Sequence, residues 1–438
     1  MYVQSVTIIN IRGFAYVDLD LRRPDGDPSG WTVLAGRNGS GKSTLLRAIA
    51  LAAAGPNTAQ SLQESFAGWI RSGKTEASVS VEVPIPVAGD EYIVTARASW
   101  EATPGTDEPH LVGTFAYEGK EPLDENRVWS NYDRSWFLAG YGPFRRLTGH
   151  GTAAQRLMVG PDRIARLVTL FREDASLIEC VEWLREIYLR RLEGKPGAAD
   201  LEKLVIGLLN DGLLPDDLVV ERVDSDGLWV RQHGVSLPLE SLSDGYRTTA
   251  ALVMDIVRHL HRCHGDGDIK FERIEIEEGT EIRILMGGVV LIDEIDLHLH
   301  VSWQQRIGFW LKRHFPNIQF IVATHSPFIC QAADPRGLIR LPAPGEDRPA
   351  EQVPEDVYHT VVNGSIDDAV LSELFGLEVA HSAEAERLRQ RVAELEVRLQ
   401  TGKASEGDAA ELAELRRRLP HSPAGDVEQV LRRLEGER

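Results

Sequence analysis

The sequence has few cysteines and no long hydrophobic run, and each absence excludes a class of protein. Its 438 residues include only three cysteines (Cys180, Cys263 and Cys330), which lie too far apart for a C-x-x-C metal or redox pair. We therefore expect free thiols in a reducing cytoplasm. No uncharged apolar stretch reaches the roughly eighteen residues that a membrane span needs. The N-terminus also lacks the basic start and the small-residue cleavage site of a signal peptide.

Positive charge is also scarce. The chain has 48 Lys and Arg against 67 Asp and Glu, which gives a formal net charge of −19. A net-acidic surface repels polyphosphate, so a dedicated nucleic-acid module is not the first expectation, although a local basic patch is compatible with this total. With 42% apolar residues, the chain is long enough for one large α/β core with insertions or for two domains.

A complete phosphate-binding pattern lies near the N-terminus. Residues 36–43 read GRNGSGKS and match G-x-x-x-x-G-K-[ST], after an apolar strand and before an amphipathic helix. Glycines let successive backbone N–H groups face phosphate oxygens, while the lysine adds a charge and the serine hydroxyl a ligand for Mg²⁺. A chance match in a polar loop would lack the flanking strand and helix. The predicted nucleotide-binding residues are Gly36, Asn38, Gly39, Ser40, Gly41, Lys42, Ser43 and Thr44.

Two carboxylates end a second apolar strand about 250 residues further on. Residues 289–294 read VVLIDE, the profile of a central parallel strand. Asp293 would orient Mg²⁺ through its water shell, and Glu294 would act as the general base that polarises water. Such a strand end alone is common in α/β proteins. Combined with the phosphate loop, it predicts ATP hydrolysis.

Two more patterns lie where they could face a phosphate. Residues 242–247 (LSDGYR) open a helix, so Ser243 and Gly245 could present a hydroxyl and a backbone N–H. The alternative is an ordinary N-cap. Residues 324–327 (THSP) end a buried strand, which places His325 within reach of a γ-phosphate. The alternative there is a core histidine.

In this order the four patterns resemble the Walker A, signature, Walker B and switch-histidine motifs of the ABC-ATPase head in the SMC, RecF and OLD-nuclease superfamily. The resemblance covers roughly 1–45 and 236–335. It implies an α/β fold, namely an ABC-ATPase (P-loop) head with a central mixed or parallel sheet, a helical insertion and a C-terminal helical hairpin. It also implies ATP and Mg²⁺ as ligands and a head-to-tail homodimer.

The resemblance assigns roles to individual residues. In such a dimer, Ser243 and Gly245 of one chain close over the ATP that the other chain holds. His325 would sense the γ-phosphate beside the general base Glu294, and Arg12 lies where such heads contact nucleotide.

This chain departs from the pattern at several positions. Asp244 replaces the first signature glycine, and His300 stands where SMC-type heads carry an aspartate. The DExDxHLH pattern is closer to the OLD-like branch, although Val301 replaces its usual proline. Residues 141–146 (YGPFRR) are the candidate for the coupling loop, and the alternative is a plain turn with two solvated arginines.

Changes in pattern along the chain predict four parts. These are an N-terminal half of the head (1–150), a helical insertion (151–215), a C-terminal half of the head (216–375) and a helical tail (376–438). In the tail, leucines at heptad-like spacing predict a short helical hairpin. That hairpin could be a packed edge of the same domain or an element that docks a partner.

Histidines also gather at the end of the helix predicted over 245–263. A metal site built from His259, His261, Cys263 and His264 is one possibility. Only His259 and Cys263 share a helix face. The simpler interpretation is therefore that these histidines interact favourably with the negative end of the helix dipole and bind no metal.

The chain lacks two further features of the superfamily. No long heptad arm interrupts the head, and only about 100 residues follow the THSP motif, too few for an OLD-type nuclease domain. We therefore expect no intrinsic nuclease. In this the chain resembles ATPase subunits of bacterial antiphage systems, namely Septu PtuA, the retron-associated ATPases and PARIS AriA.

That second resemblance implies a cytoplasmic ATPase that forms a homodimer or a higher homo-oligomer and controls a partner effector, often a nuclease. The alternative function is a RecF- or SMC-like clamp that grips DNA on ATP-driven dimerisation, which would require a basic groove. A transporter ATPase subunit is the third possibility.

Overall fold

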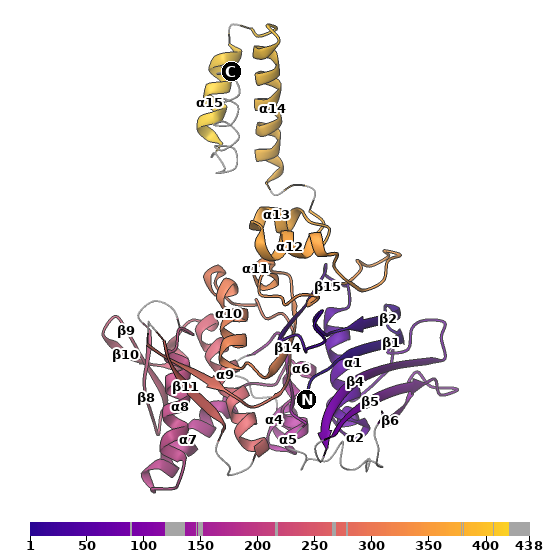
Figure 1. Cartoon of the computed structure of the whole chain (residues 1–438), viewed down its shortest axis with the longest axis vertical. Coiled ribbons are helices and arrows are strands. Elements are labelled where there is room, and N and C mark those ends of the chain that lie inside the picture. The colour runs from indigo at the N-terminus through magenta and orange to yellow at the C-terminus, as the bar shows by residue number, and fades with distance from the viewer. Residues whose placement is uncertain are drawn as a thin grey trace. The chain divides into compact units, whose positions relative to one another are not determined.

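The structure is a computed structural model that describes residues 1–87, 90–118, 136–145, 147, 152–214, 218–264, 269–276, 279–377, 379, 381–405 and 407–419. The chain divides into two compact units, Met1–Phe375 and Gly376–Arg438, and each is described by itself (Figure 1). The boundaries predicted at 150 and 215 fall within the first unit and stay predictions.

A six-stranded sheet forms the centre of the first unit. Its strand order is β16-β15-β3-β14-β13-β7, and all neighbours are parallel except the edge pair of β15 and β16. These strands are rich in Val, Ile and Leu because both faces are covered. Their bounds are Glu351–Gln352 (β16), Leu338–Arg340 (β15), Trp31–Ala35 (β3), Ile318–Thr324 (β14), Gly288–Ile292 (β13) and Leu138–Tyr141 (β7).

A five-stranded antiparallel sheet with the order β2-β1-β4-β5-β6 lies beside it. Strands β1, β2 and β3 are consecutive in sequence, but β1 and β2 do not join the sheet that contains β3. They belong to this antiparallel sheet because β1 pairs with β2 and with β4. The bounds are Phe14–Asp20 (β2), Ser5–Ile11 (β1), Glu76–Val87 (β4), Asp90–Glu101 (β5) and His110–Glu118 (β6).

Two apolar cores cover the two faces of the parallel sheet. Side chains alternate along each strand, so Val33 and Val322 lie in one core while Leu34 and Ile321 lie in the other. The second core also contains α1 (Lys42–Ala54), α2 (Pro56–Leu62) and the antiparallel sheet. In Figure 1 these elements lie on one side of β14 and the helices of the first core on the other.

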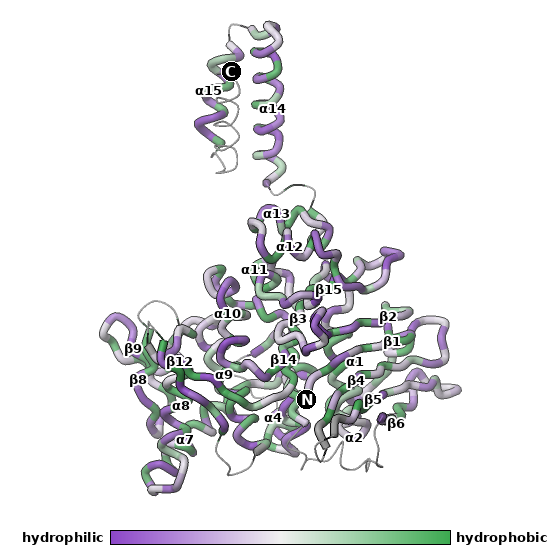
Figure 2. Tube along the Cα trace, viewed as in Figure 1, coloured by the Kyte–Doolittle hydropathy of each residue, from purple (hydrophilic) through white to green (hydrophobic). Residues whose placement is uncertain are grey.

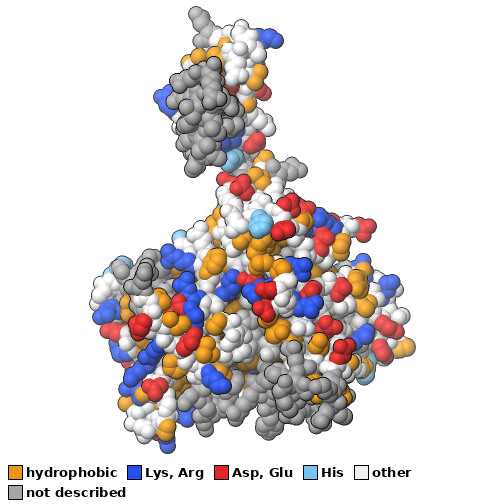
Figure 3. All heavy atoms as spheres, viewed as in Figure 1, with side chains coloured by type: hydrophobic (Ala, Val, Ile, Leu, Met, Phe, Trp, Pro, Cys, Tyr) orange, Lys and Arg blue, Asp and Glu red, His pale blue; other side chains and the backbone are white. Residues whose placement is uncertain are grey.

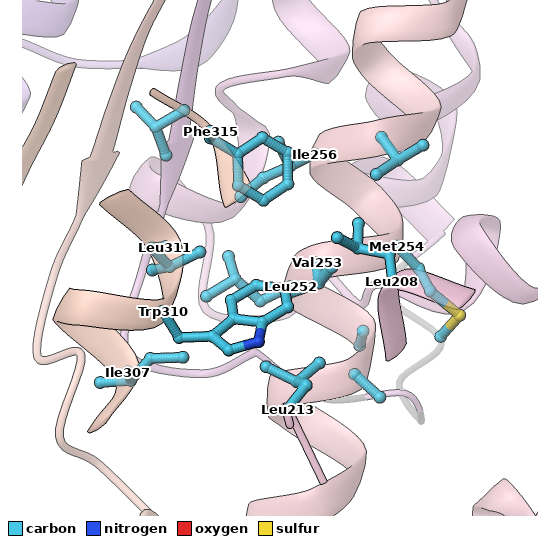
Figure 4. Close-up of a cluster of buried hydrophobic side chains, with 14 of the residues drawn as sticks. Leu208, Leu213, Leu252, Val253, Met254, Ile256, Ile307, Trp310, Leu311 and Phe315 are labelled. Atoms are coloured by element: carbon cyan, nitrogen blue, oxygen red, sulfur yellow. The ribbon is translucent and has the colours of Figure 1, made fainter. Parts of the chain in front are cut away.

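The first core is built mainly from helices. These include two helices of the segment predicted to be helical, α7 (Ile178–Leu192) and α8 (Ala198–Asn210), and then α9 (Asp244–His264) and α10 (Val301–His314). The shorter helices of that segment, α4 (Thr152–Val159), α5 (Asp162–Ala165) and α6 (Val168–Phe171), pack into the second core. Figure 4 shows Trp310 and Phe315 packed against the side of α9. The Trp310 indole N–H also donates to Asp211 O at 2.6 Å, which satisfies its polar atom.

Smaller elements complete the first unit. Strands β8 (Val219–Asp224), β9 (Gly227–Gln232) and β10 (Val235–Pro238) form one antiparallel sheet, and β11 (Phe271–Ile276) and β12 (Gly279–Ile284) form a hairpin. The unit also contains α11 (Pro327–Cys330), α12 (Glu355–Asn363) and α13 (Ile366–Leu371). The sequence patterns assigned no element to 357–371.

The second unit contains the helical hairpin predicted for the tail, with α14 (Ala383–Gln400) and α15 (Asp408–Arg418). Leu395, Leu412 and Leu415 form its small core, and apolar residues alternate with polar ones along both helices (Figure 2). Arg391 and Arg416 form ion pairs across the hairpin with Glu411 and Glu396. Among the described residues, no helix is both long enough and apolar enough to cross a bilayer.

Candidate nucleotide site

Four loops meet at one edge of the parallel sheet. Because β3, β14, β13 and β7 are adjacent and parallel, their carboxyl ends lie on the same edge. The loops that follow them are the phosphate loop 36–43, the His325 loop, the acidic pair at 293–294 and the segment 142–145. Open α/β sheets bind ligands at this edge.

The phosphate loop has the backbone of an anion cradle. Gly39 and Gly41 have positive φ values of 80° and 93°, in the left-handed region. A side chain at Gly41 would also bring its Cβ to 2.5 Å from the Phe14 ring, so only glycine fits. Helix α1 begins at Lys42 with neither a side-chain cap nor an acidic residue in its first turn. Its first N–H groups are therefore available to an anion.

Lys42 lies between the loop and the acidic strand end. Its Nζ donates to Gly36 O at 2.8 Å and to Arg37 O at 3.2 Å. Burial lowers the pKa of Lys42, while Asp293 and Glu294 act in the opposite direction. The ammonium group is thus close enough to both carboxylates to interact with them across the site.

The two carboxylates have different environments. Asp293 is 2% exposed, and within the described part of the chain its buried Oδ1 has no hydrogen-bond partner. Burying a carboxylate oxygen without a partner costs free energy unless a cation binds it. Carboxylate oxygens are preferred ligands of Mg²⁺, so Asp293 Oδ1 fits a role in holding this ion. Burial, and then the neighbouring Asp293, raises the pKa of Glu294, so this carboxylate binds a proton more readily than an ordinary glutamate. Glu294 has a positive φ of 45°.

His325 follows β14, which lies between β3, the strand before the phosphate loop, and β13, the strand before the acidic pair. Burial, and then the charge of Lys42, lowers the pKa of His325, which favours the neutral imidazole. The neighbouring Thr324 hydroxyl donates to Asp296 and accepts from Ser326 N, the latter at 2.9 Å. These bonds join the histidine loop to the turn after Glu294, and no local sequence pattern indicates this role of Asp296.

Arg12 lies at the start of α1. Its Nη1 is 3.5 Å from Thr44 Oγ1, and its guanidinium lies over the Trp69 ring at 4.8 Å. Burial, followed by the charge of Arg47, lowers the pKa of Arg12. The structure therefore brings Arg12 to the phosphate-loop helix from the antiparallel sheet.

The signature-type segment is accessible. Ser243 and Asp244 are exposed at the start of α9, where Asp244 pairs with Arg247. Gly245 packs against the turn after the acidic pair, since a Cβ there would lie 2.6 Å from His298 O. A pocket of about 330 Å³ beside Ser243 is lined by Ser243, Gly245, Tyr246, His298, Leu299, His300, Ser302 and Trp303. None of these described lining residues belongs to 36–43.

The candidate coupling loop contains a buried arginine. The alternative for residues 141–146 was a plain turn with two solvated arginines, but Arg145 is 4% exposed and donates to the carbonyl groups that follow β13. No local pattern indicates these partners, because they lie about 150 residues away. Arg146 lies outside the described residues.

The histidine cluster does not form the metal site considered as one possibility. Among the described residues, no group of three or more His, Cys, Asp or Glu side chains is arranged to hold a metal ion. Instead, His259 is buried beside Asp255 and Arg258 of the same helix, with Nε2 at 3.2 Å from Asp255 Oδ2. This buried trio anchors α9 in the core.

Comparisons with known protein families agree with this architecture. Residues 161–331 match the family described as "AAA domain, putative AbiEii toxin, Type IV TA system", and residues 5–104 match a family described as "AAA domain". The SMC head bound to the C-winged helix domain of ScpA is 14% identical, with a TM-score of 0.47, and the match covers 81% of this chain and 97% of that one. An α/β head that gathers these motifs at one sheet edge has the architecture of the ABC-type ATPases, as predicted.

Sequence relatives indicate which ATPases this chain resembles. Septu protein PtuA of Bacillus mycoides (strain KBAB4) is 25% identical over 331 residues, which cover 74% of this chain and 38% of the relative. The "Retron Ec83 probable ATPase" of Escherichia coli is 42% identical over 122 residues, which cover 28% of this chain and 20% of the relative. The predicted resemblance to Septu and retron ATPases is confirmed, although the match spans well under half the length of either relative.

Proposed function

We propose that this chain hydrolyses ATP at a site that two copies complete together. One copy supplies the phosphate loop, the acidic pair and His325, and the second supplies Ser243 and the backbone N–H of Gly245. The observation that carries the proposal is the exposure of Ser243 at the open end of α9, beside a pocket that shares no described residue with the phosphate loop. A helix start with free N–H groups favours phosphate.

Each side chain of the half-site has a distinct task. Lys42 stabilises negative charge on the β and γ phosphates, and Glu294 accepts a proton from the attacking water. Neutral His325 is placed to donate to the γ-phosphate. Ser43 and Asp293 would hold Mg²⁺, which supplies charge neutralisation on the phosphate oxygens when bound.

The second part of the proposal is that ATP-driven dimerisation controls a partner effector, a nuclease, in defence against phage. Its support is the similarity to Septu and retron ATPases. The expected homodimer, or larger homo-oligomer, would hold the effector in one nucleotide state and release it in the other.

The dimer is tested by sedimentation with and without ATP and Mg²⁺. Glu294→Gln removes the general base and should accumulate an ATP-bound dimer. Ser243→Arg places a bulky cation where the neighbour's phosphate would dock, so it should bind ATP and remain monomeric. A dimer of Ser243→Arg as stable as that of Glu294→Gln would rule out the shared site.

The effector role is tested by phage plating in the native host. Wild-type protein should protect, while Lys42→Ala and Ser243→Arg should not, and a protein that copurifies with the Glu294→Gln dimer should be required for protection. Figure 3 shows acidic and basic side chains interspersed on the face that it draws. Tight binding to duplex DNA that weakens steeply with salt, without any effector, would instead favour the DNA clamp.

A further inference from the structure

Arg145 connects the segment after β7 to the catalytic turn after β13. Its Nη1 donates to Gly142 O at 2.9 Å and to Asp293 O at 2.8 Å. Its Nη2 donates to Glu294 O at 3.0 Å and to Ile295 O at 3.3 Å. The four acceptors are all neutral backbone carbonyl oxygens, three of them in consecutive residues.

A guanidinium in this position is held at an energetic disadvantage. Burial lowers the pKa of Arg145 to about 10, an effect that the carboxylates of Asp293, Asp296 and Glu294 partly offset. An arginine on a plain surface turn would remain in water. Arg145 is instead a buried cation, and its N–H groups donate to backbone carbonyl oxygens of the turn.

The bonds determine the conformation of one residue in particular. The carbonyl of Asp293 belongs to the peptide plane before the Glu294 Cα, and the carbonyl of Glu294 belongs to the plane after it. Arg145 holds both planes, so it fixes the φ and ψ of Glu294 and with them the direction of its side chain. This φ is 45°, a left-handed value that non-glycine residues seldom adopt unless neighbouring contacts enforce it.

The other end of this connection is also rigid. A Cβ at Gly142 would lie 2.2 Å from Thr169 O, so the loop that carries Arg145 is packed tightly against α6. Thr169 Oγ1 donates to Gly140 O at 3.0 Å, and Gly140 N donates to Arg166 O at 2.8 Å. Arg145 therefore projects from a fixed support.

We propose that Arg145 is a positioning residue for ATP hydrolysis, which aims the Glu294 carboxylate by holding the two peptide planes on either side of it. The inference rests on the proposed role of Glu294 as general base. It predicts that Arg145 affects turnover and leaves nucleotide binding nearly unchanged, because its bonds go to the turn and none of the four reaches the phosphate loop.

The test compares Arg145→Ala with wild type for ATP dissociation constant, turnover and melting temperature. A displacement of about 1 Å in a catalytic group lowers turnover by about 100-fold, so we expect kcat to fall by that order while the ATP dissociation constant changes less than about threefold. Millimolar guanidinium ion should restore part of the lost turnover by occupying the vacated space. Arg185→Ala is the matched control, since Arg185 donates to Asp226 O at 2.6 Å, outside the site.

The double variant separates positioning from general stability. If Arg145 acts through Glu294, Arg145→Ala should cause no further loss of turnover in a Glu294→Gln protein. A kcat within threefold of wild type, or a full additional loss in the double variant without guanidinium rescue, would overturn the inference. If Arg145→Ala does not fold, Arg145→Lys is measured by the same criteria. Normal turnover of Glu294→Gln alone would instead contradict the proposed function.

Discussion

His259 should make the stability of the protein sensitive to mild acid. The imidazole is buried on α9, its Nε2 faces Asp255, and within the described part of the chain its Nδ1 has no hydrogen-bond partner. Protonation of Nδ1 would therefore bury a charged N–H group without a hydrogen-bond acceptor. Burial lowers the pKa of His259 to about 4 from 6.5, with Arg258 and Arg166 adding to the effect and Asp255 opposing it.

The magnitude follows from proton linkage. An unfolded histidine takes up its proton near pH 6.5 and the folded one only near pH 4, so the unfolded state binds more protons between these values and stability falls as the pH decreases. At 1.36 kcal/mol per pKa unit, this single group removes about 2 kcal/mol of unfolding free energy between about pH 7 and pH 5.

Urea unfolding of wild type and His259→Gln at both pH values measures the effect. Glutamine keeps an N–H donor for Asp255 but does not titrate, so the variant should lose about 2 kcal/mol less than wild type over this interval. Other titrating groups contribute equally to both proteins and cancel. An identical loss in the two proteins would refute the reasoning.

Three further substitutions test the half-site. Lys42→Ala should weaken ATP binding by about 100-fold, the value of a lost charged hydrogen bond, as measured with a fluorescent ATP analogue. Glu294→Gln should lower turnover by about 100- to 10,000-fold in a phosphate-release assay while binding persists. Gly41→Ala should impair binding because its φ is 93° and its Cβ would collide with Phe14, whereas Gly13→Ala, which has open space, should bind normally. Binding by Gly41→Ala equal to that of Gly13→Ala would contradict the cradle geometry.

Local patterns predicted those parts of the fold whose cause is local. The strands around Val33, Val290 and Val322 are continuous apolar runs because both of their faces are covered, and each ends in its motif. Because parallel neighbours share an edge, the meeting of Lys42 with the acidic pair follows once these strands are placed side by side. The two tail helices were also predicted from the heptad-like spacing of their leucines.

Other features depend on tertiary pairing that no local pattern records. β1 and β2 are close to β3 in sequence but join a different sheet, since Val6 of β1 pairs with Val81 of β4. The segment 342–356 is rich in Pro, Glu and Asp and has no strand pattern, but it contains β16, which pairs with the edge of β15. The hydrogen bonds of Arg145, which belongs to the candidate coupling loop, could not be predicted for the same reason, because its acceptors follow a distant strand.

Mixing two inactive variants tests most directly whether two copies build each site. In a mixed dimer of Lys42→Ala and Ser243→Arg, one site carries both defects, and the other combines an intact phosphate loop with an intact Ser243. Neither variant alone can complete a site, so only mixed dimers close on ATP, and each of them carries one intact site of two. Equal amounts should therefore restore up to about half of wild-type turnover, although each variant alone is inactive. No recovery from dimers shown to be mixed, or full turnover by Ser243→Arg alone, would contradict the account.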